Sequence, residues 1–254
     1  MMENNDSTRF KLTIAYDGSA YAGWQVQKND VGVQQLVEEA LRELFPSVKR
    51  IHSSSRTDTG VHALGMVAHV DVLKNEFKME VRKLVLALNS FLPEDIRIIR
   101  AVRAKADFHA QYDAKGKQYR YVVWNDMAMN PLLINRAWQV AKPLDLTAMK
   151  RAAKLFVGKR NYRSFASNRN YEMETYVRRL TRCDVGRKGS QLTFVIEGDG
   201  FLYKMCRGIV GTLVQVGEGR LSAAAIRRIL RAQDRRVAGM NAPACGLVLW
   251  KVLY

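Results

Sequence analysis

Residues 10–16 read Phe-Lys-Leu-Thr-Ile-Ala-Tyr, an alternation of large apolar side chains with smaller or polar ones. Successive side chains of a β-strand point to opposite faces, so the alternation predicts a strand with one buried face. After a stretch rich in Gly, Trp and Gln, the apolar residues of segment 33–44 recur three and four positions apart. That spacing is typical of an amphipathic helix.

The rest of the first half continues this alternation of element types. Residues 48–54 and 66–72 have the composition of strands and flank a loop rich in Ser, Thr and Gly. Residues 77–91 have helical spacing and end before Pro93, and residues 96–102 again have the pattern of a strand. The resulting order, β-α-β-β-α-β, predicts a ferredoxin-like unit.

The second half repeats this order without sequence identity to the first. We expect strands at 118–124, 176–185, 191–197 and 246–253, helices at 146–157 and 203–216, and a short extra helix capped by Ser222. The chain is therefore predicted to be an α+β protein with two domains, residues 8–106 and 107–254. An open sheet face, or the cleft between the halves, would be the binding surface.

Composition narrows the class of protein. The 254 residues are 48% hydrophobic and 26% charged, which are ordinary values for a globular protein. No apolar run approaches the roughly 20 residues that a membrane helix needs, and the polar N-terminus does not resemble a secretory signal. Three scattered cysteines are too few for a disulfide framework, so we expect a reducing, cytoplasmic location.

The charge is unusual in size and in distribution. The chain has 41 Lys and Arg against 24 Asp and Glu, a net charge of +17. Residues 1–130 contribute +2 of this charge and residues 131–254 contribute +15. Such an excess attracts polyanions, nucleic acid first and anionic membrane second. A surface that only aids solubility is the alternative.

Several common sites are not indicated. The sequence has no Walker A pattern and no pair of cysteines at zinc spacing. His62, His69 and Asp71 could be metal ligands, but residues two apart on a strand more often pack than bind metal. Ser53, Ser54 and Ser55 lack the glycines of a nucleophile elbow.

The loop 55–65, Ser-Arg-Thr-Asp-Thr-Gly-Val-His-Ala-Leu-Gly, carries the main candidate for chemistry. In one interpretation Asp58 only stabilises a turn and Arg56 is a surface charge. In the other, Asp58 is a carboxylate presented by a rigid sheet and kept ionised by Arg56, and it acts as a nucleophile or base. The loop sequence alone leaves both open.

Aromatic residues are a second lead. Tyr119 and Tyr121 lie two apart on one strand and share a face, whereas Phe108, Tyr112 and Trp24 lie in loops or at the ends of elements. Such rings either belong to the core or stack on unpaired RNA bases. The net charge favours RNA.

Basic residues of the second half are spread over several elements. Together they could follow a nucleic-acid backbone, holding it without reading its sequence. They include Lys150, Arg151, Lys154, Lys159, Arg160, Arg163, Arg178, Arg179, Arg182, Arg227, Arg228, Arg231, Arg235 and Arg236.

With the loop 56–63, Arg-Thr-Asp-Thr-Gly-Val-His-Ala, the chain resembles the TruA family of tRNA pseudouridine synthases. The resemblance covers nearly the whole chain, and its motifs follow in the order of the family. They are Tyr16-Asp17-Gly18, Gly23 to Gln27, Val33-Gln34, Ala87-Leu88-Asn89, Leu92 to Ile96, Phe108-His109-Ala110, Lys117 to Tyr121, Gly200 to Met205, Arg207, Ile209 to Thr212, Ala242-Pro243-Ala244 and Gly246-Leu247.

The resemblance implies two α+β halves that share one mostly antiparallel mixed sheet, with helices on one face and a central active-site cleft. It also implies a homodimer that binds tRNA. The implied reaction detaches uracil at the glycosidic bond of a uridine in the anticodon stem-loop, at tRNA positions 38 to 40, and rejoins it through C5. No metal and no other cofactor is implied.

Site residues are carried over one by one from this resemblance. Asp58 matches the catalytic aspartate, which attacks or deprotonates the sugar. Tyr119 matches the tyrosine that stacks on the flipped uracil, and Arg207 the arginine that pairs with the aspartate. Leu247 matches the apolar residue lining the pocket, and Arg56 a residue that holds the flipped nucleotide.

The sequence departs from the family pattern at five places, of which Gln111 and the change at 159–161 bear on how tRNA is held. None of them touches Asp58 or Tyr119. They are Gln111 for a usual Arg, Ser55 for Gly, Gly32 for Thr, Gly208 for Asn, and Lys159-Arg160-Asn161 in place of a stretch that often contains His-Asp.

Two other functions compete with the synthase. A non-catalytic RNA-binding or RNA-folding protein on the same fold need not keep Arg56, Asp58 and Tyr119. An RNA methyltransferase would need a glycine-rich nucleotide loop, and the sequence has none.

Overall fold

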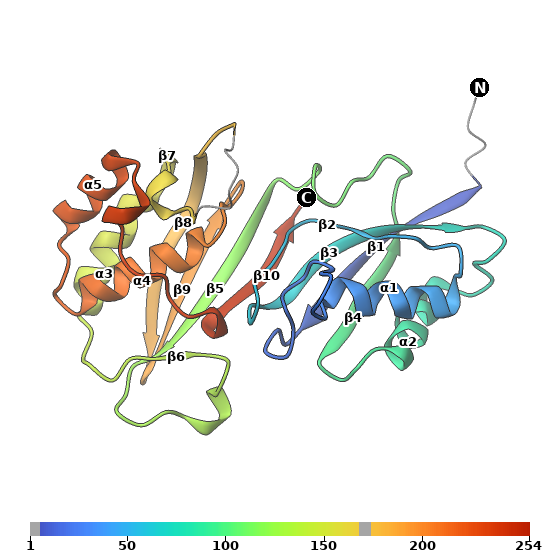
Figure 1. Cartoon of the computed structure of the whole chain (residues 1–254), viewed down its shortest axis with the longest axis horizontal. Helices are drawn as coiled ribbons and strands as arrows, with labels where there is room; N and C mark the ends of the chain where they lie inside the picture. Colours follow the sequence, from blue (N-terminus) through green and yellow to red (C-terminus); the bar gives the residue numbers. More distant parts are fainter. Residues whose placement is uncertain (1–5, 168–173) are drawn as a thin grey trace. The chain divides into compact units, whose positions relative to one another are not determined.

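A computed structural model describes residues 6–167 and 174–254 of the chain. The chain divides into two compact units, one of residues 1–115 with 249–254 and the other of residues 116–248. Each unit contains sheet and helices, which makes the chain an α+β protein as predicted (Figure 1).

The first unit is built around strand β1. β1 pairs antiparallel with β3 and β4, and the short β2 pairs antiparallel with β3. Helices α1 and α2 lie side by side over this sheet (Figure 1). The elements are β1 (Ser7–Tyr16), α1 (Val33–Leu44), β2 (His52–Ser53), β3 (His62–Leu73), α2 (Val81–Phe91) and β4 (Ile96–Arg103).

The alternation in β1 produces the core of this unit. Phe10, Leu12 and Ile14 are fully buried, while the intervening side chains remain partly exposed. Helix α1 buries Val37 and Leu41 toward the same core. The β-α-β-β-α-β order predicted for the first half is confirmed.

The second unit contributes strands in the order β5-β9-β8-β7, with β6 parallel to the end of β5. Helix α4 packs against α3, and α3 also contacts β8. The elements are β5 (Gly116–Trp124), β6 (Trp138–Gln139), α3 (Leu146–Ala153), β7 (Gly158–Asn161), β8 (Val177–Lys188), β9 (Gln191–Gly198), α4 (Met205–Gly217) and α5 (Ala223–Ala232). Strand β10 (Leu247–Leu253) begins in this unit and ends in the first.

Helix caps follow the sequence. Ser222 caps α5 as predicted, because its Oγ accepts a hydrogen bond from the Ala225 amide at 3.2 Å. Asp145 caps α3 in the same way through the Ala148 amide at 2.9 Å.

The strands form a mostly antiparallel mixed sheet, which confirms the predicted class.

The compact units differ from the predicted domains of 8–106 and 107–254 in two respects. The first unit extends to Lys115, and it includes the C-terminal residues. The Lys115 amide donates to the Leu253 carbonyl at 2.8 Å, and the Tyr254 hydroxyl donates to the Ala110 carbonyl at 2.7 Å. These hydrogen bonds join residues 107–115 to the end of the chain.

Some element boundaries also differ. The segment expected as a strand at 48–54 forms only the two residues of β2, and the helix expected from 77 begins at Val81. The helix expected at 146–157 ends at Ala153, and a 3₁₀ turn at Lys154–Phe156 leads into β7. Gly158, the first residue of β7, has a φ of 106°, which a helix cannot contain. Among the described residues, no helix is long and apolar enough to span a membrane.

Candidate active site

The loop that carries Asp58 is held at both ends by the sheet of the first unit. The Ser54 amide donates to the Val67 carbonyl of β3 at 2.8 Å, just before the loop. A turn then closes where the Val61 amide donates to the Asp58 carbonyl at 3.1 Å, with Gly60 at a φ of 74°. A glycine is favoured at the third position of a turn that needs positive φ. Asp58 is half-buried and Arg56 is exposed.

Thr57, the neighbour of Asp58, is fixed from two sides. Its hydroxyl forms a buried hydrogen bond with the Tyr16 hydroxyl at 2.8 Å. Its carbonyl accepts a hydrogen bond from the Trp24 amide at 3.1 Å. Because Thr57 is itself buried, the backbone that presents Asp58 has little freedom to move.

Two glycines let another segment approach this loop closely. A Cβ on Gly23, whose φ is 90°, would lie less than 3.0 Å from the carbonyl oxygen of Thr57. A Cβ on Gly18 would clash in the same way with the carbonyl of Val61. The Gly18 amide also donates to Nδ1 of His62 at 3.0 Å. Segment 16–24 is therefore the support of the Asp58 loop.

Tyr16, Gly18 and Gly23 belong to the motifs of the sequence, but the sequence alone assigns them no role. Their contacts join segments about 40 residues apart in the chain, which no local spacing can predict. The sequence leaves open that the Trp24 ring stacks on RNA. It is completely buried, so it belongs to the core.

Tyr119 lies in the second unit, on β5. Its side chain is 7% exposed, and its ring meets Phe201 edge to face at 5.0 Å between centroids. Tyr121 shares its face of the strand, and the Tyr121 hydroxyl donates to the Pro243 carbonyl at 2.8 Å. Burial raises the pKa of Tyr121, so this hydroxyl remains a donor at neutral pH.

Lys117 adds a positive charge to the same face as Tyr119, and sequence reasoning did not single it out. Burial, with the nearby charge of Arg178, lowers the pKa of Lys117 to about 8. The ammonium therefore remains mostly protonated at neutral pH. A lysine two residues before a strand tyrosine was the available signal, because side chains two apart share a face.

Arg207 and Leu247 flank the segment that Tyr121 holds. The Arg207 Nε donates to the Ala242 carbonyl at 2.8 Å, and the Ala242 amide returns a hydrogen bond to the Arg207 carbonyl at 3.0 Å. Leu247 begins β10 and is 6% exposed. In the first unit the structure thus places Asp58 and Arg56 on one loop. In the second it connects Arg207 and Tyr121 with segment 242–247.

These side chains suit chemistry at a nucleoside. A carboxylate on a fixed loop can act as nucleophile or base, and an aromatic ring, a guanidinium and an apolar side chain can hold a base that has left its stack. The family described as tRNA pseudouridine synthase matches residues 12–113 and 152–254. The chain belongs to this family.

Relatives of the synthase match it over almost its full length. The tRNA pseudouridine synthase A of Pelobacter propionicus is 41% identical over 96% of this chain and 98% of its own. That of Geotalea uraniireducens is 40% identical over 97% and 99%. That of Acetivibrio thermocellus is 42% identical over 96% and 98%. The resemblance to the TruA family is confirmed, and the chain is an isomerase that forms pseudouridine in tRNA.

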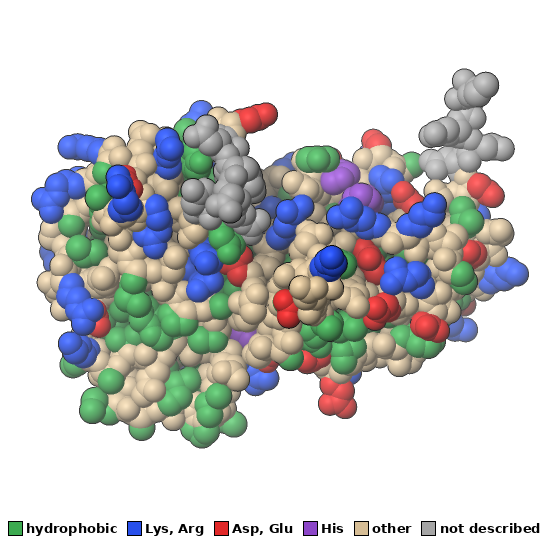
Figure 2. Space-filling view, in the orientation of Figure 1, with side chains coloured by type: hydrophobic (Ala, Val, Ile, Leu, Met, Phe, Trp, Pro, Cys, Tyr) green, Lys and Arg blue, Asp and Glu red, His purple; other side chains and the backbone are tan. Residues whose placement is uncertain are grey.

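The basic residues of the synthase lie mostly on the surface of the second unit. Lys and Arg side chains are spread over the part of its face seen in Figure 2 (blue). All but two of those named in the sequence are exposed, Arg178 and Arg235 being half-buried. This distribution fits a folded basic surface.

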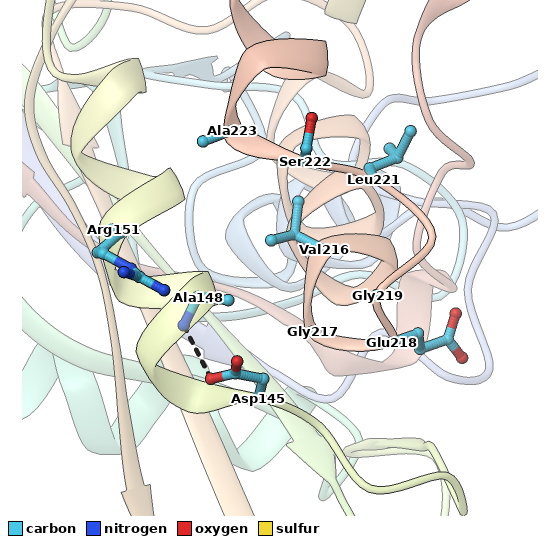
Figure 3. Close-up of a pocket in the computed structure, with 10 residues that line it drawn as sticks. All are labelled: Asp145, Ala148, Arg151, Val216, Gly217, Glu218, Gly219, Leu221, Ser222 and Ala223. Carbon is cyan, nitrogen blue, oxygen red and sulfur yellow. Dashed lines mark hydrogen bonds between the residues drawn. The ribbon is translucent and has the colours of Figure 1, made fainter.

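A hollow in the second unit is lined by Arg151, one of the basic residues named above, and by none of the predicted catalytic or uridine-binding residues. It lies between the start of α3 and the turn that joins α4 to α5 (Figure 3). Asp145 and Ser222 already cap the two helices beside it, so the caps take part of the donor capacity of both N-termini. We therefore assign the catalytic chemistry elsewhere. The hollow is lined by Asp145, Ala148, Arg151, Val216, Gly217, Glu218, Gly219, Leu221, Ser222 and Ala223.

Proposed function

We propose that this synthase converts uridines of the tRNA anticodon arm, at positions 38 to 40, to pseudouridine with Asp58 as the catalytic residue. The carboxylate attacks or deprotonates the sugar, the bond between C1′ and N1 of the uridine breaks, and the uracil turns. A bond then forms between C5 and C1′, while the bond from Asp58 to C1′ breaks or the abstracted proton returns to the sugar. The proton of C5 is lost and N1 takes up a proton, so that the product is an isomer of uridine. No cofactor takes part.

The fixed Asp58 loop is the observation that carries this proposal. Thr57 is bonded on both sides, Gly60 closes the turn, and Gly23 packs against the backbone. A carboxylate that is ordered before the substrate binds loses no further conformational entropy during the reaction. An aspartate is also ionised at neutral pH.

The remaining predicted residues would hold the substrate. Tyr119 would stack on the flipped uracil, and Leu247 would line the pocket beside it. Arg207 would pair with Asp58, and Arg56 would hold the flipped nucleotide. Taking a base out of the stack costs a few kcal/mol and is easiest in or near a loop.

We further propose that the synthase works in the cytoplasm as a homodimer. Loop 127–135 contains no charged residue in a chain of net charge +17. It exposes Met127 by 81%, Leu132 by 79% and Ile134 by 57%. A two-fold interface must be complementary to itself, which an uncharged apolar patch can be and a basic patch cannot.

Mapping pseudouridine in unmodified tRNA transcripts tests the function. We expect the wild-type protein to form pseudouridine in the anticodon arm. The Asp58→Ala variant should form none and should bind tRNA with nearly the wild-type affinity, because the deleted carboxylate contributes to the reaction more than to binding.

Two outcomes would contradict this proposal. Product formed by Asp58→Ala would remove the role of Asp58, and product elsewhere in the tRNA would remove the anticodon assignment. The alternative, an RNA-binding protein without catalysis, predicts no product from the wild-type protein. The intact Arg56, Asp58 and Tyr119 do not favour it.

A further inference from the structure

Tyr112 is an aromatic side chain that the proposed reaction does not use. It is 77% exposed, and its ring stacks on that of His109 with 4.1 Å between centroids and 25° between planes. Trp24, by contrast, is completely buried and Tyr119 is 7% exposed. One face of the Tyr112 ring is covered by His109, so its exposure leaves the other face open to solvent.

The turn that holds the pair is rigid before anything binds. Nδ1 of His109 accepts hydrogen bonds from the Gln111 amide at 3.2 Å and the Tyr112 amide at 3.3 Å. The Asp113 amide donates to the His109 carbonyl at 3.0 Å, and the Asp113 carboxylate accepts from the His109 amide at 2.9 Å. Binding to such a ring loses little conformational entropy.

The ring of His109 also packs against two other histidine rings. Its ring meets His69 edge to face at 4.8 Å, and the buried His69 accepts a hydrogen bond from the Ala110 amide at 3.1 Å. The exposed His52 lies 5.9 Å from His109, between ring centroids. In the described residues no group of three or more His, Cys, Asp or Glu is arranged to hold a metal ion. Through their ring contacts, these histidines form a packed support for the turn.

Charge and shape indicate the kind of ligand. A flat ring held in one orientation suits the π-face of an unpaired base, which any of the four bases presents. Histidine side chains (purple) reach the surface among Lys and Arg side chains (blue) in Figure 2. The net charge of +17, of which residues 1–130 contribute +2, favours a polyanion over an apolar protein surface as the ligand of the chain.

We infer that Tyr112, backed by His109, stacks on an unpaired base of the bound tRNA other than the uridine assigned to Tyr119. This inference rests on the proposed function, because it takes tRNA as the ligand. Tyr112 acts here as a positioning residue, which binds tRNA without touching the reacting atoms.

The test compares Tyr112→Ala and Tyr112→Phe with Phe91→Ala, a control at another exposed ring that is 49% exposed. Affinity for an unmodified tRNA transcript is measured at several salt concentrations, together with pseudouridine formation. Loss of a base–aromatic stack typically weakens binding about tenfold. We therefore expect Tyr112→Ala to raise Kd and KM about tenfold with kcat unchanged. Tyr112→Phe and Phe91→Ala should stay near wild type.

The salt dependence provides a second readout. A stacking contact releases no counterions, so Tyr112→Ala should leave the slope of log Kd against log salt unchanged. An unchanged Kd for Tyr112→Ala, or a Phe variant as weak as the Ala variant, would overturn the inference. So would a changed sedimentation coefficient with unchanged tRNA affinity, which would indicate a contact between copies of the chain.

The two proposals fail in distinguishable ways. If wild-type protein forms pseudouridine and Tyr112→Ala matches it in every measurement, only the stacking inference falls. If wild-type protein forms none but Tyr112→Ala weakens tRNA binding, the stacking site stands and the proposed function falls.

Discussion

Gly23 controls how closely segment 16–24 approaches the Asp58 loop. At its φ of 90°, any other residue is strained, and a Cβ would clash with the carbonyl of Thr57. Gly23→Ala should therefore displace the loop as well as strain its own backbone. We expect a loss of pseudouridine formation of tenfold or more, with tRNA affinity little changed, measured as single-turnover rate and Kd.

Gly189 provides the matched control for this prediction. It has a φ of 58° in the turn between β8 and β9, and an added Cβ there would meet no atom within 4 Å. Gly189→Ala introduces the backbone strain alone, about 1–2 kcal/mol, so it should lower the melting temperature and keep the rate. Equal rates for the two variants would show that the close approach of Gly23 does not position Asp58.

For individual residues, the sequence predicts some side-chain positions but not every role. The spacing of Tyr119 and Tyr121 correctly placed both rings on one face of a strand. The local sequence does not distinguish an Asp58 that only stabilises a turn from one that acts in catalysis, because an Asp before Thr-Gly suits both roles. The structure shows that its carbonyl closes the turn, which does not prevent the side chain from taking part in chemistry.

His69 joins β3 to the turn at 109–113, and this connection should depend on pH. Burial, with the charges of Arg9, His109 and His52, lowers the pKa of His69 from 6.5 to about 4, while Asp71 partly opposes the shift. Neutral His69 accepts the Ala110 amide through Nδ1. Below pH 6.5 His69 is protonated in the unfolded chain, but in the folded protein it stays neutral until the pH approaches 4.

The free energy of unfolding should therefore fall as pH decreases from 6.5 toward 4, by about 2 kcal/mol from this residue. Urea unfolding at a series of pH values measures it. In His69→Asn an amide oxygen can replace Nδ1 but cannot titrate, so its stability should fall less over this range. Parallel curves for the two proteins would assign the pH dependence to other groups, such as the carboxyl of Asp71.

At the scale of elements, the long segments were predictable and the short ones were not. β1, β3 and the helices have enough residues to show a period of two or 3.6. β6 and β7 have two and four residues, and they exist because neighbouring strands offer hydrogen-bonding partners. The compact units have other limits than the predicted domains for a similar reason, since residues 249–254 belong to the same unit as residues 1–115.

At the scale of the whole molecule, part of the positive charge lies where it destabilises the sheet. Lys159 of β7 lies directly opposite Arg179 of β8, and Arg160 lies opposite Arg178. Like charges opposite one another destabilise a sheet. Among the residues that the structure describes, no carboxylate forms an ion pair with Lys159 or Arg179. A polyanion would relieve this repulsion, so we expect the pair to contact tRNA phosphates.

Each phosphate contact contributes about 0.9 to the slope of log Kd against log salt. The double variant Lys159→Ala/Arg179→Ala should therefore weaken tRNA binding at low salt and reduce the slope by about 2. Its melting temperature should not fall, because a repulsive pair has been removed. Arg182 is the control on the same strand, since Asp184 already neutralises it at 2.8 Å, and Arg182→Ala should change the slope less. If both variants keep the wild-type slope, β7 and β8 do not contact the tRNA backbone, and the charge of residues 131–254 must act through other elements.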